Sequence, residues 1–112
     1  MQPLDGVVDA LAGLDVEGVD GLRAADVLVE LRRVRARLAA VEARLVARVD
    51  GERPWAEAGY LGTAASLAAS DHTSLDEARG DVRLARRLGS MPATARALAA
   101  GDITVAHARG LA

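Results

Sequence analysis

The sequence predicts an all-α protein, a helical bundle of five or six helices organised around one long heptad-patterned helix. Three observations lead to this fold class. Apolar residues recur at helical spacing along most of the 112-residue chain. Hydrophobic residues make up 51%, nearly all of them Ala, Leu and Val, which suit closely packed helices. Phe is absent and only two aromatic residues are present, so residues that favour strands are few. This length predicts a single domain over residues 1–112.

The organising element is a helix predicted over residues 22–49. Leu and Val recur there at alternating spacings of four and three residues, which places them on one side of a helix. No Pro or Gly interrupts the pattern between Gly21 and Gly51. A helix of this length would be roughly 40 Å long, so the rest of the chain must cover this apolar line or leave it for a partner. We call these residues the seam: Val27, Leu31, Val34, Leu38, Val41 and Leu45.

Shorter helices are predicted on both sides of the long one. Residues that can accept hydrogen bonds from free N–H groups mark three helix starts: Asp20, Thr104, and Ser74 in a capping box with Glu77. Gly51 is expected to end the long helix in the left-handed conformation. In the loop that follows, Trp55 is predicted to pack rather than to stack on a base, because stacking platforms normally use several aromatic residues. The shorter helices are predicted at residues 3–13, 63–69, 74–88, 91–100 and 104–112.

Charge alternates in blocks along the chain, although the net charge is only −2. Residues 1–31 and 49–78 are acidic, residues 32–48 and 79–112 are basic, and all fourteen basic residues are Arg. This alternation predicts neutralisation between antiparallel helices, and it equally suits a basic face formed by the two Arg-rich blocks. The candidate DNA contacts share one side of the 74–88 helix: Arg79, Arg83, Arg86 and Arg87.

The segment from Thr63 to Leu88 has the outline of a helix-turn-helix, with a short helix, a polar turn and a longer Arg-bearing helix. The alternative is an ordinary helical hairpin whose Arg side is solvated. Asp76 and Glu77 weigh against base contact, because they stand at the end of the second helix that would read bases. Asn, which pairs with adenine, is absent from the chain. Both interpretations stay open.

No catalytic, cofactor or metal site can be assembled from the sequence. Cys is absent, and His72 and His107 lie in separate motifs with no acid pair beside them. No nucleophile elbow and no strand followed by a Gly-rich phosphate loop is found. We expect no enzyme activity, no cofactor and no small-molecule ligand. The apolar runs are far shorter than the roughly 20 residues of a membrane span, and the acidic N-terminus is no secretory signal, so we expect a cytoplasmic protein.

The second half of the chain carries a family resemblance. Four segments are involved: Leu-Ala-Arg-Arg-Leu at 84–88, Met-Pro-Ala-Thr at 91–94, Ala-Leu-Ala-Ala-Gly-Asp-Ile at 97–103 and Ala-His-Ala-Arg at 106–109. They resemble the actinobacterial domain of unknown function 222 of the 13E12 repeat family, which usually stands N-terminal to an HNH endonuclease domain. The chain departs from the family at Ser66, where Trp is usual before Leu.

The resemblance implies a non-catalytic accessory role. HNH chemistry uses a His general base and a His metal ligand on a ββα element that holds a divalent ion. This sequence has no such His pair, no Asn and no strand pair. We therefore expect either the non-catalytic N-terminal part of a longer architecture or a short paralogue that lost the nuclease, in both cases contributing DNA contact or substrate positioning. The alternative is a helical oligomerisation or protein-interaction module that uses the seam as its interface, with a second copy or a partner helix.

Overall fold

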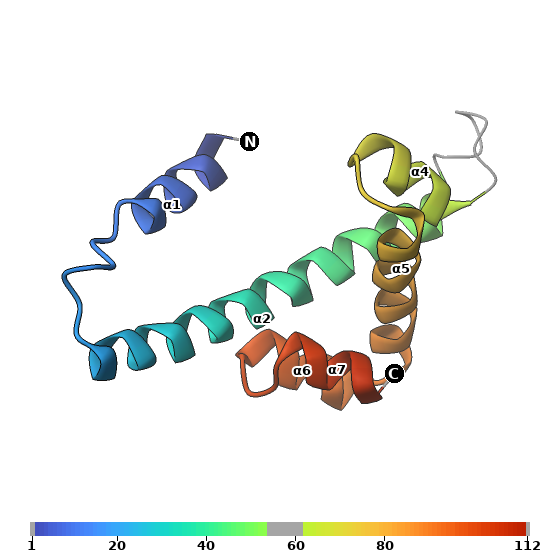
Figure 1. Cartoon of the computed structure of the whole chain (residues 1–112). Helices are drawn as coiled ribbons and strands as arrows, with labels where there is room; N and C mark the ends of the chain where they lie inside the picture. The colour runs from blue at the N-terminus through green and yellow to red at the C-terminus, as the bar shows by residue number, and fades with distance from the viewer. Residues whose placement is uncertain (1, 54–61, 112) are drawn as a thin grey trace. The chain divides into compact units, whose positions relative to one another are not determined.

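The computed structural model contains six α-helices and no strand within the residues that it describes, 2–53 and 62–111 (Figure 1). The all-α prediction is confirmed. Every predicted helix is present, and each end lies within about one helical turn of its predicted position. The helices are α1 (Gln2–Ala12), α2 (Gly21–Glu52), α4 (Thr63–Ser70), α5 (Leu75–Ser90), α6 (Pro92–Ala100) and α7 (Val105–Leu111).

Contacts between Cα atoms divide the chain into two compact units, Met1–Leu31 and Arg32–Ala112, which are described separately. The first unit contains α1 and the first turns of α2. Asp20 caps α2 as predicted, because its Oδ1 accepts a hydrogen bond of 2.8 Å from the backbone N–H of Arg23. The second unit contains the rest of α2 and all of the shorter helices that follow it. The expectation of a single domain stays a prediction.

The end of α2 differs from the expectation. Gly51 was expected to end the helix, but α2 continues through it to Glu52, and Arg53 takes the left-handed conformation with a φ of 55°. The last turn is stabilised by an ion pair of 2.6 Å between Arg48 Nη2 and Glu52 Oε1, one turn apart on the helix. A glycine permits a left-handed stop without imposing one, and here the helix extends past it.

Polar caps fix the starts of α5 and α7. Ser74 Oγ accepts from the backbone N–H of Glu77 at 3.0 Å, which confirms the predicted N-cap. The carboxylate of Glu77 accepts a hydrogen bond from the hydroxyl of Thr73, the residue before the cap. Thr104 caps α7 in the same way, accepting from the backbone N–H of His107 at 3.0 Å. These caps satisfy N–H groups that have no partner inside their helices.

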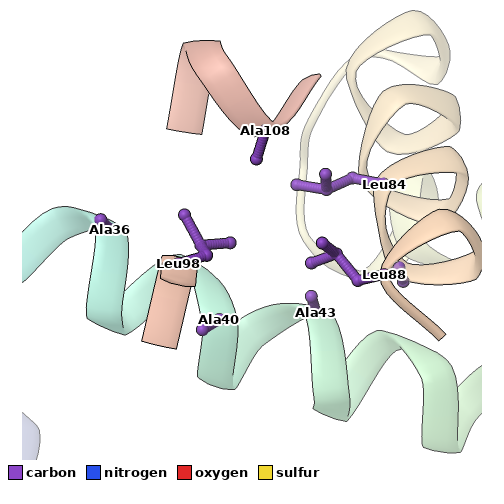
Figure 2. Packing of buried hydrophobic residues seen from close by; sticks show 8 residues of the cluster. Ala36, Ala40, Ala43, Leu84, Leu88, Leu98 and Ala108 are labelled. Carbon is purple, nitrogen blue, oxygen red and sulfur yellow. The ribbon is translucent and has the colours of Figure 1, made fainter. Parts of the chain in front are cut away.

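The core of the second unit is built from small and medium aliphatic side chains. Three alanines of α2 face leucines of α5 and α6 (Figure 2). Leu98 of α6 is fully buried and lies between Ala40 of α2 and Ala108 of α7 in the view of Figure 2. Small side chains at the contact let helices approach closely. The buried cluster consists of Ala36, Ala40, Ala43, Leu84, Ala85, Leu88, Leu98 and Ala108.

The turn between α6 and α7 lies directly against the backbone of α2. Gly101 has a φ of 78°, and a Cβ atom added there would lie 3.2 Å from the carbonyl oxygen of Arg33. The turn closes α6 with two hydrogen bonds, from Gly101 N–H to the Leu98 carbonyl at 3.0 Å and from Asp102 N–H to the Ala97 carbonyl at 2.9 Å. A left-handed glycine and a close backbone approach coincide at this position.

Candidate functional site

The part of the seam that lies in the second unit is exposed. Within the second unit, 38% of Val34, 54% of Leu38, 48% of Val41 and 61% of Leu45 is accessible to solvent. The two remaining members, Val27 and Leu31, belong to the first unit. The sequence allowed two outcomes, cover by the shorter helices or a surface left open. Within the second unit, the shorter helices leave these four seam residues open to solvent.

The side of α2 that packs is the alanine row, defined here as Ala36, Ala40 and Ala43. These residues follow one another at spacings of four and three, so they form a line of their own along the helix. Successive residues turn by about 100°, which places the alanine row roughly half a turn around α2 from the seam. The shorter helices pack on the alanine row, so α2 buries these three small residues and presents the larger residues of the seam.

Two grooves border the seam. One, of about 520 Å³, separates α2 from the shorter helices; its walls include Leu38 and Leu45 of α2, Leu84 of α5 and Val105 of α7. The other, of about 450 Å³, is lined by Val34, Leu38 and Val41 and by Ala99 of α6. The seam is therefore a ridge between two depressions, a surface that the ridges and grooves of another helix can match.

Charged side chains flank the seam on both sides. Arg37 and Arg44 each immediately precede a seam leucine, and Arg35 and Glu42 each immediately follow a seam valine. All four are exposed, and none forms an ion pair within the described residues. Their charges are therefore available to a partner seated on the seam.

The four candidate DNA contacts on α5 fall into two groups. Arg86 is held by Asp50, and Arg79 lies 3.8 Å from a carboxylate oxygen of Asp76 on the same helix. Arg83 and Arg87 are exposed, lie one turn apart, and have no ion pair among the described residues. The geometry thus leaves two of the four guanidinium groups available to bind a phosphate.

Asp50 links three helices, a role that the sequence analysis missed. Its carboxylate accepts from Arg86 Nε at 2.9 Å, from Arg86 Nη2 at 2.8 Å and from the Thr63 hydroxyl at 2.8 Å. These hydrogen bonds from Arg86 and Thr63 lower the pKa of Asp50 to about 2. Arg86 lies thirty-six residues further along the chain, a separation at which no local sequence signal could identify the pair.

A short polar turn joins α4 to α5, and the two helices contact one another. His72 takes the left-handed conformation in the turn, with a φ of 53°, and Ser74 starts α5. Asp76 and Glu77 occupy the first turn of α5, where their charge complements the helix dipole. This acidic helix start is the part of a helix-turn-helix that would enter the major groove, so a DNA contact has to use the later turns of α5.

The described residues contain no group of three His, Asp or Glu side chains that could hold a metal ion. His72 lies in the turn between α4 and α5, whereas His107 lies in α7, and both are exposed. Among the described helices, none combines the length and apolar character that crossing a membrane requires. The predicted packing role of Trp55 lies outside the described residues.

These features define a class of protein: an all-α domain whose longest helix packs by alanines and exposes a heptad seam. The chain matches the model of a family described as a domain of unknown function (DUF222) over residues 25–112, and it belongs to this family. The resemblance noted in the second half of the sequence is confirmed, and the match extends back into α2. Searches among curated proteins and solved structures gave no significant match.

Proposed function

We propose that this protein is a helix-mediated interaction module whose interface is the seam of α2. The observation that supports the proposal is the exposure of Val34, Leu38, Val41 and Leu45 in one line, opposite the side of α2 that packs. Single exposed aliphatic residues are common on protein surfaces, but a continuous row at heptad spacing is the pattern of a helix interface.

The exposed seam residues are large enough to stabilise a complex when a partner covers them. Covering a fully exposed Leu or Val side chain contributes about 1.5–3 kcal/mol, so burying the exposed half or so of four such residues offers several kcal/mol to a partner helix. The grooves beside the seam leave room for the side chains of that helix. Nothing in the proposal requires a change in the packing of the alanine row.

A synthetic probe helix tests this function without knowledge of the natural partner. The probe carries Leu at every a position, Val at every d position and Gln at e and g, with a fluorescent label. Its anisotropy is measured while the protein is added at concentrations where the protein alone is monomeric. We expect saturable binding to the unmodified protein and at least about tenfold weaker binding to Leu38→Glu, because the substitution places a charge in the apolar line.

The control variant is Val29→Glu. Val29 is also an exposed aliphatic residue of α2, 62% accessible, but it lies outside the seam. This variant should bind the probe as the unmodified protein does, and both variants should keep the same helicity by circular dichroism. Absence of binding to the unmodified protein, or equal binding to both Glu variants, would refute the seam as an interface.

A second candidate function is that of an accessory domain in an HNH-endonuclease-type protein, contacting DNA. The observation that favours it is the pair Arg83 and Arg87, exposed on α5 without ion pairs among the described residues. Their guanidinium groups would contact phosphates, while Asp76 and Glu77 keep the helix start away from the bases. This function and the seam interface use different surfaces, and both fit the cytoplasmic location expected from the sequence.

Titration of a labelled DNA duplex at low salt tests the second candidate. We expect affinity that falls steeply with salt and is lost in the double variant Arg83→Glu/Arg87→Glu. The double variant Arg23→Glu/Arg96→Glu is the matched control, since it reverses two exposed charges that lie outside α5 and are not adjacent to a seam residue. If the unmodified protein does not bind, or if both double variants bind equally, the α5 contact is excluded.

A further inference from the structure

We propose that the partner of the seam is further copies of this chain, aligned parallel and in register, with Arg37 of each copy paired to Glu42 of its neighbour. This inference rests on the proposed function of the seam and adds the identity, direction and register of the partner. It follows from the order of residues around the exposed line of α2 and from the charges beside that line.

The spacing fixes the heptad positions. Leu31, Leu38 and Leu45 occupy a positions, because each is followed three residues later by the next seam residue or by the end of the pattern, and Val27, Val34 and Val41 occupy d positions. The flanking g position before Leu38 is then Arg37, and the e position after Val41 is Glu42. Both side chains are exposed and form no ion pair within the described residues.

In a parallel, in-register coiled coil, a g residue lies beside the e residue five positions later in the neighbouring helix. Arg37 therefore meets Glu42 of the next copy, and Glu30 meets Arg35 by the same spacing. Both contacts join opposite charges. The remaining flanking positions within α2 add no like-charge contact, because Arg44 meets Val49. Each interface between two parallel copies is thus electrostatically complementary along its length.

An antiparallel arrangement is less favourable. There, g residues face g residues and e residues face e residues. The two antiparallel registers that keep all of Val34, Leu38, Val41 and Leu45 in contact place Arg37 against either Arg37 or Arg44 of the other copy. Each register therefore joins like charges near the centre of the interface, although the register with Arg44 also joins Arg35 to Glu42. The antiparallel contacts are thus mixed, whereas the parallel register joins opposite charges only, which favours the parallel arrangement.

The position of β-branched side chains in the seam indicates how many chains associate. Leu at a combined with a β-branched residue at d shifts parallel coiled coils from two chains toward three or four. Leu28 and Val49, at e positions, widen the apolar strip in the same sense. The shorter helices pack on the alanine row and form the far walls of the two grooves beside the seam, so the ridge of the seam stays exposed to neighbours.

Sedimentation equilibrium of the full chain over a wide concentration range, with charge-reversal variants, tests the inference. We expect a mass that rises from one chain to three or four. Arg37→Glu and Glu42→Arg should each raise the concentration of half-association by about tenfold, because each turns attraction into repulsion at every interface. The double variant should associate as the unmodified protein does. Arg83→Glu, a reversal on α5, should have no effect.

The outcomes separate the inference from the function on which it rests. Association that Leu38→Glu abolishes but that Arg37→Glu leaves unchanged or tightens would mean antiparallel copies and overturn the parallel register. A chain that stays monomeric yet binds the synthetic probe helix would overturn self-association while leaving the seam interface in place. A monomer that also fails to bind the probe would overturn both. Parallel pairing with a mass of two chains would overturn the inferred number of copies alone.

Discussion

The carboxylate of Asp50 connects α2 to two other helices, α4 and α5. It stands in the last turns of α2 and binds the first residue of α4 through the Thr63 hydroxyl and the middle of α5 through the Arg86 guanidinium. Thr63 is buried, with 3% of its surface exposed, so loss of the carboxylate would leave its hydroxyl without this acceptor. The bidentate contact also explains why Arg86 is not available to DNA.

The depressed pKa of Asp50 predicts how stability depends on pH. Its carboxylate is bound more favourably in the folded protein than in the unfolded chain, so this stabilisation is complete above pH 4 and is lost as the pH falls toward 2. Thermal unfolding followed by circular dichroism between pH 6 and 2 should show this loss. Asp50→Asn should be less stable than the unmodified protein at pH 6, and this difference should shrink at pH 2. Asp102→Asn, at an exposed carboxylate, is the control. A difference between Asp50→Asn and the unmodified protein that does not change with pH would contradict this account.

Gly101 allows a second prediction at the residue scale. Gly101→Ala should lower the free energy of unfolding by about 1–2 kcal/mol or more, because the new side chain meets a left-handed φ and the backbone of Arg33 together. Gly89→Ala is the matched control. Gly89 lies inside α5 with open space around it, so the same change should be neutral or should stabilise by up to about 1 kcal/mol. Chemical denaturation of both variants decides whether the turn presses on α2.

At the scale of single elements, α2 has two apolar sides that differ in the size of their residues. The heptad pattern predicted the helix, its approximate length and the line of large aliphatic residues correctly. It did not identify the side that packs. A hydrophobic pattern shows which residues are apolar, but it does not show where small side chains let two helices approach closely. Ala36, Ala40 and Ala43 have the same four-and-three spacing, and their small side chains admit Leu98 and Leu88. A search for rows of Ala would have found them.

A comparison of two leucines tests this assignment of the two sides. Leu98→Ala should lower the free energy of unfolding by about 2–5 kcal/mol, because Leu98 is 0% exposed and its removal leaves a cavity. Leu38→Ala should lower it by no more than about 1 kcal/mol, since Leu38 is 54% exposed. Urea denaturation at a dilution that excludes association provides both values. Equal losses in the two variants would mean that the seam is packed within the chain.

The candidate DNA surface illustrates another limit of sequence reasoning. Four Arg on one side of α5 could be placed on the helix from their spacing, but their partners could not. Arg86 binds Asp50, which lies thirty-six residues earlier in the sequence, and Arg109 of α7 pairs with Asp81 of α5 at 3.0 Å. Such pairs depend on how helices cross, which the local pattern does not contain. Arg83 and Arg87 are the residues on which a DNA contact now depends.

At the scale of the whole molecule, both functions that the sequence left open can be matched to separate surfaces. The alternating charge blocks are used in part for neutralisation, as the pair between Asp50 and Arg86 shows. The charges beside the seam are not used within the described residues, and their order suits a parallel neighbour. Membership in the DUF222 family establishes the relationship of this chain without assigning it an activity, so the seam is the feature that most needs a direct test.

The rate of thiol labelling at single positions is that test, because the chain contains no cysteine. Leu38→Cys and Ala40→Cys introduce a thiol on the seam and on the alanine row, and Val29→Cys provides an exposed reference on α2. In dilute protein we predict rapid labelling at positions 38 and 29 and protection at position 40. At concentrations where the chain associates, labelling at position 38 should slow while position 29 stays reactive. Protection at position 38 in the dilute monomer, or a rate there that does not change on association, would contradict the seam as an interface.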